Sequence, residues 1–236
     1  MAKAGKKYLK AAAQVEKERY YEPLAAIELA KSAAFAKFDE SVEVSVKLGV
    51  EPEHADQIVR GSVSLPHGTG KTVRVLVFAK GEKAKEALAS GADYVGEEDM
   101  IAKVESGWLG FDRVVATPDM MSKVSKVAKR LGTQGLMPNP KLGTVTNDLA
   151  NIVKQIKAGR IEFKTEKKAG NIHAIIGKRS FEPAHLLANL KAFIDALIKL
   201  KPAASKGVYI RSVSISTTMG AGIKVDTAAL LQNLNV

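Results

Sequence analysis

The chain has 236 residues, of which 46% are hydrophobic, and a formal net charge of +11. This length is sufficient for two domains with buried cores, and no window approaches the roughly 18–20 apolar residues of a membrane-spanning helix, so we expect no membrane association. The absence of cysteine excludes disulfides, thiolate metal sites and cysteine nucleophiles, and is typical of a reducing compartment.

The positive charge is concentrated towards the end of the chain. Residues 1–67 hold ten Lys/Arg and ten Asp/Glu, residues 68–150 hold twelve and ten, and residues 151–236 hold fourteen and five. Such an excess favours a polyanionic partner. Aromatic residues make up 6% of the chain, which argues against recognition by rows of stacking rings.

The first third of the chain predicts helices followed by strands. Residues Lys3 to Arg19 favour a basic helix, without the apolar core of a signal peptide, so we expect a protein that is not secreted. Pro23 opens a second helix towards Phe35. Ser41 to Leu48 alternates as a half-buried strand, and Gln57 to Leu65 is a second strand that Pro66 closes.

The middle third alternates short strands and helices, which predicts a small parallel sheet covered on both faces. The expected strands are Val73 to Ala79, Ala92 to Val95 and Phe111 to Thr117. The expected helices are Glu82 to Ala89, Glu97 to Ser106, Thr117 to Arg130 and Asp148 to Gly159.

The last third returns to a mixed pattern. Ile161 to Thr165 and Ile172 to Ile176 are expected to form a basic hairpin. Pro183 opens a long amphipathic helix. Ser212 to Gly222, reading SVSISTTMGAG, alternates as a strand and ends in hydroxyls, a methionine and glycines.

Together these elements predict an α/β protein in which one α+β domain is made of both ends, residues 1–67 and 160–236. A compact three-layer α/β domain is inserted at 68–159. The chain would cross between the two domains twice, once at each end of the insertion, and these two crossings would form a hinge. The expected hinge residues are Pro66, His67, Gly68, Gly70, Gly159 and Arg160.

Catalytic, cofactor and metal sites are not predicted. His67 to Thr72 is similar to a phosphate loop, but its first glycine is missing and a strand follows it. The inserted domain has Ala79-Lys80-Gly81-Glu82 where a dinucleotide fingerprint would stand. The histidines lack metal-ligand spacing.

Binding chemistry gathers in three segments of the two-ended domain. These are Lys37-Phe38, the basic hairpin from Lys164 to Lys178 with His173, and Ser212 to Gly220. Lysines attract phosphates, hydroxyls and a glycine allow a close fit, and Phe38 and Met219 supply apolar contact. We therefore predict RNA binding by a non-enzymatic protein, provided that the three segments share one face.

Two other classes remain open. An enzyme or nucleotide-binding protein would use the inserted α/β domain and would bind a nucleotide tightly there. A protein-interaction module would use the basic face for acidic partners and would not bind structured RNA.

Four motifs, in order, resemble the family of bacterial large-ribosomal-subunit protein one, the protein of the mobile stalk beside the exit site. The resemblance runs from about Gly5 to Val225. The motifs are Lys37-Phe38-Asp39-Glu40, Arg60 to Gly68 (RGSVSLPHG), Gly135 to Lys141 (GLMPNPK) and Thr217-Thr218-Met219-Gly220.

The resemblance implies a Rossmann-like inserted domain, no cofactor, and a monomer within the cytoplasmic ribosome. It implies binding of stalk-region ribosomal RNA, help in the release of deacylated tRNA, and repression of the messenger RNA of its own operon. Ala221 replaces the proline that many members have after the Met-Gly pair. The implied RNA-binding residues are Lys37, Phe38, Lys164, Lys167, Lys168, His173, Lys178, Ser212, Ser216, Thr217, Thr218, Met219 and Gly220.

Overall fold

The computed structural model of the protein describes residues 5–16, 18–166 and 168–232. The chain divides into two compact units. Unit 1 combines Met1–Gly70 with Ile161–Val236, and unit 2 is the intervening Lys71–Arg160. The domain boundaries expected from the sequence lie within three residues of these.

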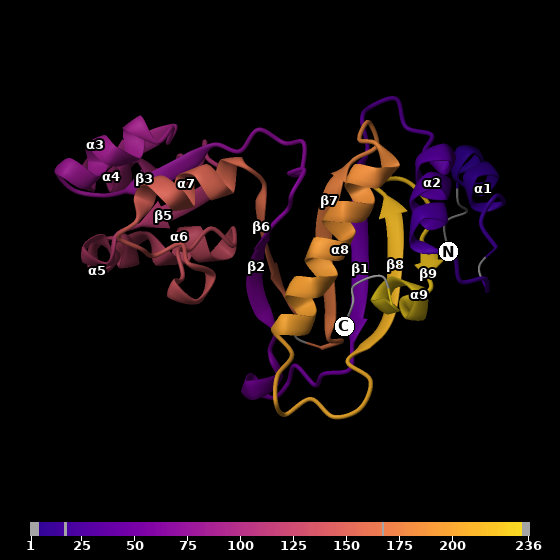
Figure 1. Ribbon diagram of the computed structural model, residues 1–236. Coiled ribbons are helices and arrows are strands. Elements are labelled where there is room, and N and C mark those ends of the chain that lie inside the picture. Colours follow the sequence, from indigo (N-terminus) through magenta and orange to yellow (C-terminus); the bar gives the residue numbers. More distant parts are fainter. Residues whose placement is uncertain (1–4, 17, 167, 233–236) are drawn as a thin grey trace. The chain divides into compact units, whose positions relative to one another are not determined.

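Unit 1 contains a four-stranded antiparallel sheet of order β7-β1-β8-β9, in which strands from both ends of the chain lie side by side (Figure 1). A separate two-stranded sheet joins β2 and β6. The described strands of these two sheets are β1 (Ser41–Leu48), β2 (Arg60–Ser64), β6 (Arg160–Lys164), β7 (Asn171–Lys178), β8 (Ile210–Thr217) and β9 (Ile223–Val225). The described helices of unit 1 are α1 (Lys6–Ala12), α2 (Pro23–Ala33), the 3-10 turn Ala55–Gln57, α8 (Pro183–Lys199) and α9 (Thr227–Gln232).

The central strand β1 has one buried and one open face. Val42, Val44 and Val46 are fully buried, whereas Glu43 and Ser45 between them are partly exposed. Because side chains alternate along a strand, this pattern fixes which residues of the paired strands face solvent.

Helices α2 and α8 pack on the buried face of this sheet. Pro183 begins α8, where its missing N–H costs no helical hydrogen bond. Leu186, Leu190, Phe193 and Leu197, spaced three or four residues apart, are fully buried. Each such burial stabilises the fold by about 1.5–3 kcal/mol. Hydrophobic burial therefore holds both helices on one side and leaves the other side of the sheet open.

Unit 2 is a three-stranded parallel sheet of order β4-β3-β5 with helices on both faces. Leu76 and Phe78 pack with α4 and the segment 120–131, and Val75 and Val77 pack with α3 and α7. This layering confirms the predicted α/β class. The elements are β3 (Val75–Phe78), α3 (Glu82–Ala89), β4 (Tyr94–Gly96), α4 (Glu98–Ser106), β5 (Arg113–Ala116), α5 (Met121–Val124), α6 (Ala128–Thr133) and α7 (Leu149–Lys157), with 3-10 turns at Pro118–Met120, Ser125–Val127 and Pro140–Leu142.

The expected basic hairpin is wrong. Strand β6 pairs with β2 and strand β7 pairs with β1, so the two strands belong to different sheets. Packing explains the difference, because Phe163 of β6 lies edge-on against Phe193 of α8, with ring centroids 5.3 Å apart. Gly61 of β2 leaves space for the Phe163 ring, since a Cβ there would lie 3.1 Å from that ring and 2.3 Å from Leu200.

Two expected helices are shorter than predicted. Helix α1 ends at Ala12, and Val15 then turns into the core. The helix expected from Thr117 to Arg130 is broken into short α and 3-10 turns. There Ser125 donates its hydroxyl to the Met121 carbonyl at 2.8 Å, a bond that bends helices. Within the described ranges, no helix has the length and hydropathy needed to cross a membrane.

Candidate nucleic-acid interface

The sheet face opposite α2 and α8 presents polar side chains in rows across the strands. In each row, one residue of β1 lies between a partner from β7 and a partner from β8. The second of the three rows also includes a residue of β9. The rows are Ile175–Glu43–Ser216, His173–Ser45–Ser214–Lys224 and Asn171–Lys47–Ser212. We call this surface the open face. Besides Glu43 and the apolar Ile175, it gathers hydroxyls, two lysines and a histidine, which are groups that bind phosphate and ribose.

His173 is held in place in the middle row of the open face, on the edge strand β7. Its Nδ1 shares a hydrogen bond of 2.9 Å with the Ser45 hydroxyl. Its Nε2 lies 3.4 Å from a carboxylate oxygen of Glu166. The imidazole is therefore oriented by a partner on each side while more than half of its side chain stays exposed.

The turn that follows β8 is tightly packed. The Gly220 N–H donates to the Thr217 carbonyl at 3.0 Å. A Cβ on Gly220 would lie 2.3 Å from the Thr217 Oγ1, and Thr217 is itself buried. Glycine is therefore required at position 220, because the Thr217 side chain lies so close that any other residue would force it to move.

Glu40 joins this turn to two other segments. Its side chain is fully buried, and its Oε2 accepts a hydrogen bond of 3.0 Å from the backbone N–H of Met219. Its Oε1 accepts one of 2.8 Å from the Ala36 N–H. Its carbonyl accepts a third, also of 2.8 Å, from the Arg179 N–H.

The environment of Glu40 favours its charged form. Burial raises its pKa, but hydrogen bonds from the backbone N–H groups of Met219 and Ala36 lower it more. The Thr217 hydroxyl and the charge of Arg179 add to this, so the pKa lies below its ordinary value of 4.5. Glu40 is therefore a carboxylate at neutral pH, which is the form that accepts both N–H groups.

Further bonds connect the same segments. Asp39 accepts from the N–H and the hydroxyl of Ser180, at 3.0 and 2.8 Å. Ser41 donates its N–H to the Thr218 hydroxyl at 3.0 Å and accepts from Lys178 at 2.9 Å. We call residues 36–41, 178–180 and 217–220 the three-loop cluster.

Two large apolar side chains extend from this cluster into solvent. Phe38 is 55% exposed and Met219 is 51% exposed. The backbone beside each is fixed by Glu40, so neither side chain is needed to hold its own loop. An exposed ring and thioether on a preorganised backbone are suited to contact with a base or a sugar.

The structure brings ten of the predicted RNA-binding residues onto two adjoining surfaces. Lys37, Phe38, Lys178, Thr217, Thr218, Met219 and Gly220 lie in the three-loop cluster or at its strand ends. His173, Ser212 and Ser216 lie on the open face. Within the first group, Thr217 points into the core and Thr218 is bonded to Ser41.

The remaining lysines do not join the cluster. Lys164 is the last residue of β6, and Lys168 lies shortly before the first residue of β7, Asn171. The cluster adjoins the other end of β7, at Lys178, which is seven positions further along the strand. At about 3.3 Å per residue, this places Asn171 about 23 Å from the cluster end of β7. Lys167 lies outside the described residues.

Of the expected hinge residues at the first crossing, His67 and Gly68 are hydrogen-bonded within unit 1. His67 donates its N–H to Asn189 Oδ1 at 3.0 Å, and Asn189 donates to the Gly68 carbonyl at 2.9 Å. Gly70 has a φ of 71° and packs so closely that a Cβ would lie 2.9 Å from Lys178. Pro66, before His67, is exposed.

The second crossing is bonded to unit 2. Gly159 follows α7 with a φ of 107°. Arg160 donates to the carbonyl of Leu142 at 2.8 Å and to Gln155 at 2.7 Å. Whether these segments act as a hinge stays a prediction.

Sequence reasoning missed the residues of β1 and the role of Glu40. Glu40 entered the sequence analysis only as the last residue of the Lys37-Phe38-Asp39-Glu40 motif, although it is the buried centre of the cluster. The alternation of Ser41 to Leu48 already separated a polar set, Glu43, Ser45 and Lys47, which could have been placed beside Ser212 to Ser216 as the open face.

The net charge is divided almost equally between the units. Unit 1 holds 21 Lys/Arg and 15 Asp/Glu, and unit 2 holds 15 and 10, so the net charges are +6 and +5. The excess counted over residues 151–236 included Lys154, Lys157 and Arg160, which belong to unit 2. Charge therefore does not distinguish the two units, and the candidate interface rests on the shape and chemistry of the cluster.

A basic chain whose sheet presents hydroxyls, lysines and an oriented histidine beside exposed Phe38 and Met219 has the surface of an RNA-binding protein. The Ribosomal protein L1p/L10e family matches residues 29–221, and the chain belongs to this family. It is thus a structural, RNA-binding protein of the large ribosomal subunit, in a family of structural proteins and not of enzymes. This confirms the resemblance noted in the sequence at the level of the family.

Proposed function

We propose that unit 1 binds a folded site of large-subunit ribosomal RNA at the mobile stalk through the three-loop cluster and the open face. The observation that carries this proposal is the fixed backbone of the cluster, from which Phe38 and Met219 extend into solvent. Preorganised loops bind a folded RNA without a large ordering cost. The hydroxyls and lysines of the open face, including Lys47 and Ser212, then contact its backbone.

Three finer roles rest on the family and on the four sequence motifs. As a bacterial-type stalk protein in the cytoplasm, this chain would act as a monomer within the ribosome and help deacylated tRNA to leave the exit site. It would also repress its own operon by binding a messenger RNA that mimics the ribosomal site. The same cluster would serve both RNAs, so one variant should weaken binding to both.

The test is binding of the purified protein to a stalk-region ribosomal RNA fragment, with a scrambled duplex of equal length as the competitor. Wild type, Met219→Gly and Phe38→Ala are compared at two salt concentrations. Leu88→Ala is the matched control, because Leu88 is 56% exposed on α3 of unit 2. Shape-specific recognition predicts a preference for the fragment that persists at high salt and is lost in the two cluster variants.

The opposite results are equally clear. Equal binding to both RNAs that disappears at high salt would leave only a basic surface and would contradict the proposal. Unchanged affinity in both cluster variants would show that the three-loop cluster is not part of the interface. Binding of an acidic protein in place of RNA would support the interaction-module alternative.

A further inference from the structure

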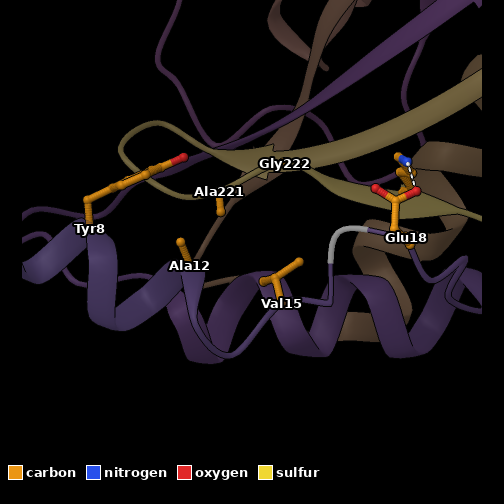
Figure 2. A pocket seen from close by; sticks show the side chains of 7 residues that line it. Tyr8, Ala12, Val15, Glu18, Ala221 and Gly222 are labelled. Atoms are coloured by element: carbon orange, nitrogen blue, oxygen red, sulfur yellow. Dashed lines mark ion pairs between the residues drawn. The ribbon is translucent and has the colours of Figure 1, made fainter. Parts of the chain in front are cut away.

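A groove of about 330 Å³ lies between α1 and the segment that follows the three-loop cluster. Figure 2 shows Tyr8 extending from α1 at one end of the groove and Glu18 at the other, with Ala12 and Val15 between them. Ala221 borders it from the strand side. The volume is at the lower end of the range of small-ligand pockets, so it suits one flat ring and no larger group.

The groove is held by the core and by backbone bonds of unit 1. Ala11 and Val15 are 5% and 7% exposed, and Val15 packs in the main core. The Tyr21 N–H donates to the Lys224 carbonyl at 3.0 Å, and the Glu16 N–H donates to the Tyr21 hydroxyl at 3.1 Å. These contacts hold the segment that follows α1 against β9, and that segment forms one wall of the groove.

The chemistry of the groove suits an uncharged aromatic ring. Tyr8 supplies an aromatic wall and the alanines and Val15 supply aliphatic contacts. The two charged residues, Lys224 and Glu18, face each other at 3.7 Å. Because their charges compensate, the groove has no net attraction for a phosphate, whereas a base could stack on Tyr8.

The groove is continuous with the proposed RNA surface. Ala221 is two residues after Met219, so their Cα atoms are at most about 7.6 Å apart. Lys224 pairs in register with Ser214 of the open face. The exposed lysines of α1, Lys7 and Lys10 among them, add attraction for the RNA backbone.

We propose that this groove binds one unstacked base of the RNA that the three-loop cluster holds. The inference rests on the proposed function and adds a subsite to it. A base next to the Met219 contact would leave the RNA stack and lie against the Tyr8 ring. The N-terminal helix would then be part of the interface, although the motif comparison placed no contact there.

The first test is the affinity of Tyr8 variants for the stalk-region RNA fragment. Tyr8→Ala is expected to weaken binding about five- to tenfold by loss of one stacking partner. Tyr8→Phe keeps the ring and is expected to bind like wild type. Leu9→Ala is the matched control, because Leu9 is 54% exposed on the same helix and does not line the groove. Thermal melts of each variant show whether α1 stays folded.

The second test asks whether the Tyr8 side chain acts on one particular nucleotide. Acylation of RNA 2′-hydroxyls in the wild-type and Tyr8→Ala complexes identifies the nucleotide whose reactivity changes, and that nucleotide is then made abasic. The abasic RNA should lose affinity for wild type, and Tyr8→Ala should bind both RNAs equally. Independent effects of the two changes, or a Tyr8→Ala protein that binds like wild type, would overturn the inference. If Met219→Gly weakens binding and Tyr8→Ala does not, the groove alone is refuted and the proposed function stands.

Discussion

The Glu40 carboxylate accepts a hydrogen bond of 3.0 Å from the backbone N–H of Met219, although 179 positions separate the two residues. The same carboxylate accepts from the Ala36 N–H at 2.8 Å. One buried anion thus sets the position of both exposed apolar side chains of the cluster, Phe38 and Met219. The stability of unit 1 and its RNA affinity should therefore depend together on Glu40.

Glu40→Gln should lower the free energy of unfolding of unit 1 by about 1–3 kcal/mol. The amide can accept one of the two backbone N–H groups, but its NH₂ group would then face the other donor. The buried N–H of Met219 or Ala36 would lose its partner. Chemical denaturation of wild type and variant, followed by far-UV circular dichroism, measures this difference.

The same variant should weaken binding to the RNA fragment at temperatures where it remains folded, because its two loops are no longer fixed. Glu28→Gln is the control, since Glu28 is exposed on α2 and its substitution changes the net charge equally. If both variants bind alike, the loop geometry set by Glu40 does not determine the affinity. That result would contradict the proposal that the fixed backbone of the three-loop cluster determines RNA binding.

Acid should destabilise unit 1 partly through Glu40. The pKa of Glu40 is lower in the folded protein than its ordinary value of 4.5. Its contribution is therefore fully present above about pH 4.5 and is lost as the pH falls through the folded value. Unfolding free energies measured from pH 6 to pH 3 should fall more steeply for wild type than for Glu40→Gln. Parallel curves for the two proteins would contradict this prediction.

Gly220→Ala should destabilise unit 1 by about 1–3 kcal/mol, because the new methyl group would overlap the buried Thr217 side chain. Gly222→Ala is the matched control, since a Cβ at Gly222 meets nothing within 4 Å. The measurement is the shift of the melting temperature of each variant. Equal shifts would show that the turn relaxes around a side chain and that Gly220 is not required by packing.

The elements of unit 2 could be predicted from the sequence because their signals are local. Glu82 to Ala89 was predicted as a helix with the ends that α3 has in the structure, and the β-branched run from Val73 predicted the buried strand β3. In unit 1, the strand from Ser41 and the helix from Pro183 were predicted equally well. Periodicity reports burial directly, so it identifies these segments without any partner.

The partners of strands could not be predicted in the same way. The sequence after Arg160 gives two strands and a basic turn, and a hairpin is the nearest pairing. The Phe163–Phe193 contact, which draws β6 towards α8, depends on residues 30 positions apart. Glu40 illustrates the same limit for the site, because a carboxylate beside a strand gives no local sign that it will accept the N–H of Met219.

Asn189→Leu should release the first crossing between the units while keeping the size of the side chain. Asn189 is fully buried. Its amide donates to the carbonyls of Gly68 and Ile176, at 2.9 and 2.7 Å, and it accepts from the His67 N–H at 3.0 Å. Leucine can make none of these bonds, so unit 1 should lose about 1–3 kcal/mol of stability. Amide hydrogen exchange should become faster at His67 and remain unchanged in α3 and α4 of unit 2. Unchanged protection of the His67 amide would show that the crossing does not depend on Asn189, and the hinge would then have to be sought elsewhere in the chain.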